Sequence, residues 1–142
     1  MKLNIIRFMV LTAVALILGS AAFAQTLNLR AVVPFNFVVG DKVYPAGEYA
    51  VNSNGNGDYL LFVAGRSTKE SGLTLSYQIT SGMPAEHTVL IFQHVGDAYF
   101  LQQVWTAGSR VGLGLHLSRL ETLMALNTAK PETTIVAANI VH

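Results

Sequence analysis

Short strand-like runs recur along this chain and constrain its fold more than any other feature. From Leu27 onward, β-branched and aromatic residues gather in runs that Gly, Asn, Asp and Pro interrupt at intervals of roughly 8–12 residues. This spacing is typical of an all-β sandwich or a partly open barrel, here with about seven or eight strands. The runs that qualify are Leu27–Val39, Glu48–Ser53, Tyr59–Ala64, Leu73–Thr80, Thr88–Val95, Ala98–Thr106 and Thr133–Ile140.

One segment changes from strand-like to helical spacing. Ser118 to Glu121 has the S-x-x-E form of a capping box, in which the serine side chain accepts a hydrogen bond from the first turn. We predict a short helix near 119–126, whose apolar stripe covers one end or face of the β structure. The stripe consists of Leu117, Leu120, Leu123 and Met124.

The segment from His87 to Ala107 predicts the clearest hairpin. Gly96 and Asp97 supply the two loop residues of a type II′ turn, with glycine at the position that needs a positive φ. Counted from this turn without interruption, the register pairs His94 with Tyr99. It places on the same face Leu90, Phe92, Leu101, Gln103 and Trp105.

Four side chains of this hairpin are the candidate ligand-binding residues: Trp105, Tyr99, Gln103 and His94. An exposed Trp or Tyr ring suits stacking on a sugar, while Gln and His supply hydrogen bonds. The competing interpretation is that the rings are core or interface anchors and that His94 and Tyr99 form an ordinary cross-strand pair.

Catalytic and metal-binding patterns are missing from the sequence. No serine lies in a G-x-S-x-G elbow, and no two carboxylates are singled out by their spacing. The chain has no Cys and four His, and His87 and His94 lie too far apart on one strand to share an ion. We therefore expect a non-enzymatic protein with no catalytic residue, no metal site and no cofactor.

The first 24 residues indicate where the chain goes. Two basic residues precede an apolar run from Phe8 to Leu18, and the small-residue pattern Ala22-Phe23-Ala24 follows. This order is typical of a secretory signal peptide, and the run is shorter than the roughly 20 residues that cross a bilayer. We expect cleavage after Ala24, export to the periplasm or beyond, and a single β-rich domain over 25–142 without a transmembrane segment.

Signal removal also changes the charge balance. The whole chain has nine Lys or Arg and eight Asp or Glu, so loss of Lys2 and Arg7 leaves seven against eight, a net charge of about −1. A slightly acidic chain without a basic cluster is not expected to bind nucleic acid. Few charges and no disulfides instead favour a strand face covered by another copy of the chain, or by a partner in the envelope or matrix.

Two longer stretches carry a family resemblance. Val33–Tyr49, VPFNFVVGDKVYPAGEY, is similar to a V-P-F-x-F-x-V-G-x-x-x-x-P-A-G-x-Y pattern, and Val89–Gly108 is similar to an F-x-x-x-G-D-x-Y-F-L-x-x-V-W pattern. With SRLE at Ser118–Glu121, these motifs resemble an uncharacterised family of small exported β-rich proteins from Acidobacteria-like genomes. The resemblance implies export and a compact β-rich domain.

Together these features favour an exported, non-enzymatic structural or interaction protein of the bacterial envelope or extracellular matrix. The alternative is a periplasmic β-barrel that binds a small ligand or carbohydrate. That alternative predicts an apolar pocket between the sheets, with Trp105, Tyr99 and Gln103 near its mouth.

Overall fold

The computed structural model describes residues 27–53, 60–127 and 130–141, so the predicted signal peptide lies outside the described residues. The described part is mostly strand, with a short helix near its C-terminal end. In chain order its elements are β1 (Leu27–Val33), β2 (Phe37–Val39), β3 (Lys42–Tyr44), β4 (Gly47–Ser53), β5 (Leu60–Gly65), β6 (Ser71–Thr80), β7 (Val89–Val95), β8 (Ala98–Trp105), β9 (Val111–Leu115), α2 (Arg119–Asn127) and β10 (Glu132–Ile140).

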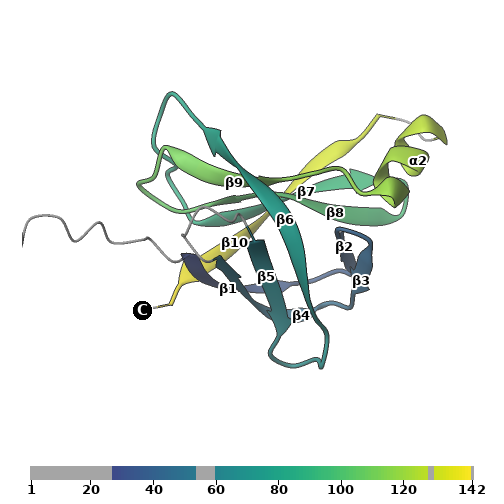
Figure 1. Cartoon of the computed structure of the whole chain (residues 1–142), viewed down its shortest axis with the longest axis horizontal. Coiled ribbons are helices and arrows are strands. Elements are labelled where there is room, and N and C mark those ends of the chain that lie inside the picture. Colours follow the sequence, from purple (N-terminus) through teal and green to yellow (C-terminus); the bar gives the residue numbers. More distant parts are fainter. Residues whose placement is uncertain (1–26, 54–59, 128–129, 142) are drawn as a thin grey trace, which may run out of the picture.

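Eight of the strands close into an antiparallel barrel (Figure 1). The order around it is β8-β7-β10-β1-β4-β5-β6-β9, and β9 returns to β8 through the pairs Gln103–Gly114 and Val104–Leu113. The predicted all-β fold is confirmed, and the last strand pairs with the first. Closure pairs strands that an open sheet would leave as edges, so it removes rows of unsatisfied backbone groups.

β2 and β3 form a small hairpin outside the ring of eight. Pro34, which has no N–H to donate, follows the end of β1 and separates it from β2. β2 runs parallel to β8, with Val38 beside Phe100. The hairpin turns at Gly40, whose φ is 61°, and the backbone N–H of Ala46 is bonded to the Asn36 side chain at 3.0 Å.

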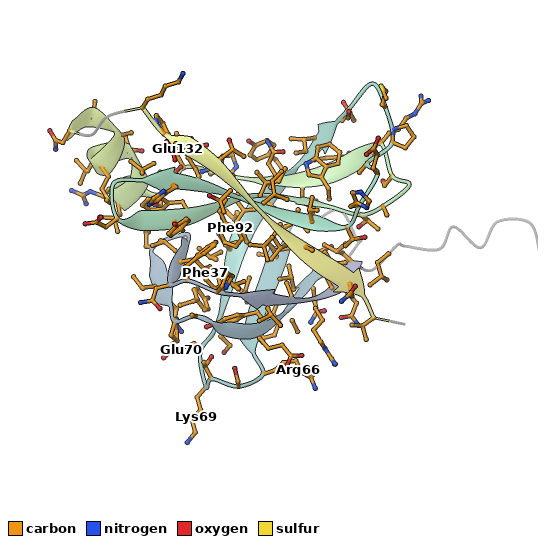
Figure 2. All side chains as sticks on the ribbon, turned by 180° about the vertical axis from the view of Figure 1, so that it is seen from behind. Phe37, Arg66, Lys69, Glu70, Phe92 and Glu132 are labelled. Carbon is orange, nitrogen blue, oxygen red and sulfur yellow. The ribbon has the colours of Figure 1, made fainter. Side chains whose placement is uncertain are left out.

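Apolar side chains fill the centre of the barrel. Phe37 reaches inward from β2 and meets Phe92 from β7, with ring centroids 5.5 Å apart (Figure 2). Tyr44 and Tyr49 pack on the same Phe37 ring at 5.3 and 4.9 Å. Around these rings lie the inward-facing residues of alternating strand positions, including Leu29, Val33, Val51, Leu61, Val63, Leu90, Leu101 and Val104.

A β-bulge in the β7–β8 hairpin corrects the predicted register. The pairs His94–Tyr99 and Phe92–Leu101 are as predicted, but Ile91 pairs with Gln103, so Gln102 is an extra residue. Because side chains alternate faces, one extra residue reverses every assignment beyond it. Val104 therefore points into the core, and Gln103 and Trp105, predicted to share the face of Phe92 and Leu101, lie on the opposite, outer face.

The predicted helix is confirmed as α2, but its predicted packing is wrong. The N–H of Glu121 donates to the Ser118 hydroxyl at 3.0 Å, as a capping box requires. Met124 packs against a small outer cluster of Val38, Val95 and Phe100. α2 instead turns Glu121 towards the barrel. The leucines predicted to cover the barrel are therefore 42–62 % exposed, namely Leu117, Leu120 and Leu123. No helix in the described ranges is long and apolar enough to cross a bilayer.

Candidate functional site

The four candidate ligand-binding residues fall into two separate places. Trp105 and Gln103 lie on the outside of the barrel, where the indole Nε1–H donates to the Gln103 amide oxygen at 2.8 Å. His94 and Tyr99 lie on the inner side of the same hairpin, with parallel rings 4.1 Å apart. Phe35 stacks on Tyr99 at 3.9 Å. A single ligand cannot contact all four, because the bulge puts the two pairs on opposite faces.

The half-buried His94–Tyr99 pair lies at the edge of the core, against which Tyr99 packs. Phe35, which stacks on Tyr99, also meets Phe92 edge to face at 5.1 Å, so the stack continues the aromatic cluster of the barrel. Cross-strand ring pairs of this kind stabilise a hairpin by up to about 1 kcal/mol. The two residues thus form the cross-strand pair that the competing interpretation describes.

Trp105 lies in a groove of about 400 Å³ on the outer face of β7, β8 and β10. Its floor is apolar and is made by neighbouring register pairs, Ile91 with Ile135 and Val89 with Trp105. The segment from Ser81 to His87 forms the wall, with side chains of Ser81, Met83, Pro84, Ala85, Glu86 and His87. This volume lies within the range of roughly 300–1,000 Å³ that small-molecule sites occupy.

The wall of the groove is tied to the barrel at several points. Ala85 exchanges backbone hydrogen bonds with the next loop, donating to Ser109 at 2.9 Å and accepting from Gly108 at 2.8 Å. At the end of the wall, buried Thr88 accepts from the Ala107 N–H through its hydroxyl at 3.0 Å. Its carbonyl accepts from Ala138 on β10 at 2.9 Å. The groove is thus a preformed feature of the fold.

The position of the Trp105 ring depends on a glycine in the neighbouring strand. A Cβ on Gly112 would lie 2.7 Å from Cδ2 of Trp105, and a Cβ on Gly114 would lie 2.7 Å from the Tyr77 ring. The glycines of β9 therefore allow close approach of aromatic rings. With its N–H already donated to Gln103, Trp105 offers the groove an apolar ring surface.

A second hollow of about 440 Å³ lies where β6, β8 and β9 meet the start of α2. Its lining includes Gln102, the bulged residue, whose amide donates to the carboxylate of Glu121. Glu121 is only 4 % exposed, and burial raises the pKa of its carboxyl, while a backbone hydrogen bond from Ser118 acts in the opposite direction. This buried pair connects α2 to the barrel.

Stability should fall as pH rises because of Glu121. Its folded pKa lies above the unfolded value, so the folded state keeps this proton to higher pH than the unfolded chain does. The protonated Glu121 carboxyl contributes its whole stabilisation at pH values below the unfolded pKa. This stabilisation is lost as the pH rises from the unfolded pKa through the folded pKa. Glu121→Gln is expected to remove this fall, as measured by thermal unfolding from about pH 4 to pH 7. The control variant Glu86→Gln, changed in an exposed loop, should keep the fall in stability. An unchanged fall in Glu121→Gln would mean that other groups cause the pH dependence.

The sequence pointed to Trp105 but missed its neighbours. Met83 and Pro84 lie outside the predicted strands, and Ile135 lies in the predicted strand Thr133–Ile140, to which no binding role was assigned. No local pattern links these segments, because barrel closure brings them together. Within 27–53, 60–127 and 130–141, no three His, Asp or Glu side chains are arranged to hold a metal ion.

The geometry describes an apolar groove on the outside of a closed barrel. Comparison with protein-family models, with curated proteins and with solved structures finds no match to this chain. The resemblance to an exported family therefore stays a prediction, and any function must be argued from the residues themselves.

Proposed function

We propose that the protein is an exported, non-enzymatic interaction protein of the bacterial envelope or extracellular matrix, which binds a partner protein in the Trp105 groove. The observation that carries the proposal is the apolar floor of this groove, which lies outside a barrel whose centre is occupied by its own aromatic side chains. The partner would therefore bind on the surface of the barrel.

The floor favours an aliphatic or aromatic side chain of the partner. Ile135 is 63 % exposed, and covering aliphatic side chains contributes about 1.5 kcal/mol or more for each one fully buried. Val89, Ile91 and Ile135 supply no hydrogen-bond donor from their side chains, and the indole N–H is held by Gln103. Polar groups are confined to the wall, where Glu86 and His87 are exposed.

A carbohydrate is the second candidate ligand. A sugar ring could stack on Trp105 while its hydroxyl groups bond to Glu86 and His87 across the groove. This possibility keeps the predicted ligand-binding function but moves it from the barrel mouth to the outer face. It differs from the leading proposal because it depends on the polar wall more than on Ile135.

Trp105 is the single Trp of the chain, so its fluorescence reports directly on the groove. Titration with a capped, leucine-rich hexapeptide is expected to shift the emission to shorter wavelength with about millimolar affinity. Ile135→Lys should abolish the shift, because it puts a charge on the floor. Val32→Lys is the matched control, since Val32 is 65 % exposed on the neighbouring strand β1 but does not line the groove.

Maltohexaose and an N-acetylglucosamine oligomer distinguish the two ligand classes in the same assay. A shift with these sugars that Glu86→Ala removes and Ile135→Lys spares would favour carbohydrate binding over the leading proposal. No shift with either class of probe would contradict the groove as a binding site.

Export is tested separately. Recovery of a product beginning at Gln25 from the periplasm or medium would support export, and retention of the intact chain in the cytoplasm would contradict it.

A further inference from the structure

A second apolar surface lies on the outside of β5 and β6, which run side by side in the barrel (Figure 1). Leu60 pairs with Leu75, and Phe62 pairs with Leu73, so these four side chains form a compact cluster. Tyr77 extends it along β6. We call these five residues the leucine face. Leu73 and Leu75 are each 65 % exposed.

The leucine face carries no charge. Neither β5 nor β6 contains an Asp, Glu, Lys or Arg residue. The charged residues of this region, Arg66, Lys69 and Glu70, lie in the turn that joins the two strands (Figure 2). Of these, Glu70 pairs with Lys42 at 3.0 Å, and Arg66 lies 3.6 Å from Glu48. The surface of the two strands is therefore uncharged.

We propose that the leucine face binds the same face of a second copy, forming a two-fold symmetric dimer. In such an interface each patch meets its own copy, so any charge would be brought near a like charge. An uncharged apolar patch escapes this penalty and is complementary to itself. A lipid surface is the weaker candidate, because binding to anionic lipid requires basic residues on or around the apolar face.

The area of the face suits a dimer. Its five side chains expose on the order of 500 Å² of surface, which is near the upper end for the largest apolar patch of a monomer. Tyr77 continues it towards Leu117, since both line the hollow of about 440 Å³, and Leu117 is 62 % exposed. With a polar rim, this surface approaches the roughly 800 Å² per partner that stable interfaces bury.

Sedimentation equilibrium on the protein recovered after export tests the dimer. The wild type is expected to be dimeric in the micromolar range. Leu75→Lys should weaken association at least about tenfold, because it sets two like charges against each other in an apolar contact. Leu73→Ser is a second variant, and circular dichroism checks that both remain folded. Val32→Lys, at a site with the same 65 % exposure on β1, should remain dimeric.

The absence of Cys from the chain allows a direct test of symmetry. Leu75→Cys is expected to give a covalent dimer with a short bismaleimide, whereas Val32→Cys is not. A wild type that stays monomeric at high concentration would overturn the proposal. So would equal dissociation of Leu75→Lys and Val32→Lys, or a monomer that floats with phosphatidylethanolamine–phosphatidylglycerol vesicles.

The dimer and the groove are separable. Ile135→Lys, which should abolish the Trp105 fluorescence shift, is expected to stay dimeric, because β10 lies on a different part of the barrel from β5 and β6. Conversely, monomeric Leu75→Lys should keep the fluorescence shift. Loss of both properties in either variant would contradict the assignment of two independent surfaces.

Discussion

Phe37→Ala is expected to lower the free energy of unfolding by about 3–5 kcal/mol, a large part of the stability of a domain of this size. The ring is 2 % exposed and contacts three other aromatic rings, those of Tyr44, Tyr49 and Phe92. Its removal would leave a cavity where β2 meets the barrel interior. Urea unfolding at one fixed protein concentration measures the change.

Val43→Ala is the control for the Phe37 substitution. Val43 lies in the same small hairpin but is 57 % exposed, so its truncation should cost less than about 1 kcal/mol. A cost below about 1 kcal/mol for Phe37→Ala would mean that β2 and β3 are an appendage and not part of the core. Equal costs for both variants would show that hairpin formation, and not the cavity, sets the effect.

Gly65→Ala is expected to cost about 2–3 kcal/mol by overpacking the turn between β5 and β6. A Cβ at this position would collide with the Thr68 hydroxyl and lie 2.8 Å from the Thr68 carbonyl oxygen. The turn has little freedom to move, because the Gly65 N–H already donates to the Glu70 carbonyl at 2.7 Å. Relief of the collision therefore requires this hydrogen bond to lengthen or break.

Gly82→Ala is the matched control for the turn. No atom lies within 4 Å of a Cβ built on Gly82, so the change should be neutral or slightly stabilising. Thermal unfolding of the two variants measures the difference. If Gly65→Ala proved as stable as Gly82→Ala, the turn would be less tightly packed than its hydrogen bonds indicate.

Many elements of this fold could be predicted because their causes are local. Gly96 has a φ of 60° and no non-glycine residue in the described ranges has a positive φ, as expected for the type II′ turn predicted at Gly96-Asp97. Pro34 follows β1 because it lacks an N–H, and the Ser118 hydroxyl caps α2. Each of these effects acts over a few residues.

Two strands were not predicted, and each has a weak local signal. β3 spans only Lys42 to Tyr44, too short for a period of two to be read. β9 contains Gly112 and Gly114, which are poor strand formers by themselves. β9 forms because β6 and β8 supply backbone partners and because the glycines admit the rings of Tyr77 and Trp105.

The location of the candidate site was only partly predictable. Trp105 lines a groove on the outer face, but the structure does not bring all four candidate residues together there. Tyr99 and His94 stack on each other at the edge of the core, whereas Met83 and Ile135 line the groove. Hydrophobic period in one hairpin cannot reveal an inserted residue when both of its faces are apolar.

The amino-acid sequence by itself determined the all-β class, most strand positions, the turn at Gly96 and the capped helix, because short-range geometry and side-chain chemistry specify these features. The tertiary structure alone decided which face each side chain occupies and which distant segments meet. The bulge at Gln102 reversed the alternation beyond it, and closure of the barrel placed β10 beside β7. Both outcomes depend on long-range strand pairing, which no local pattern records.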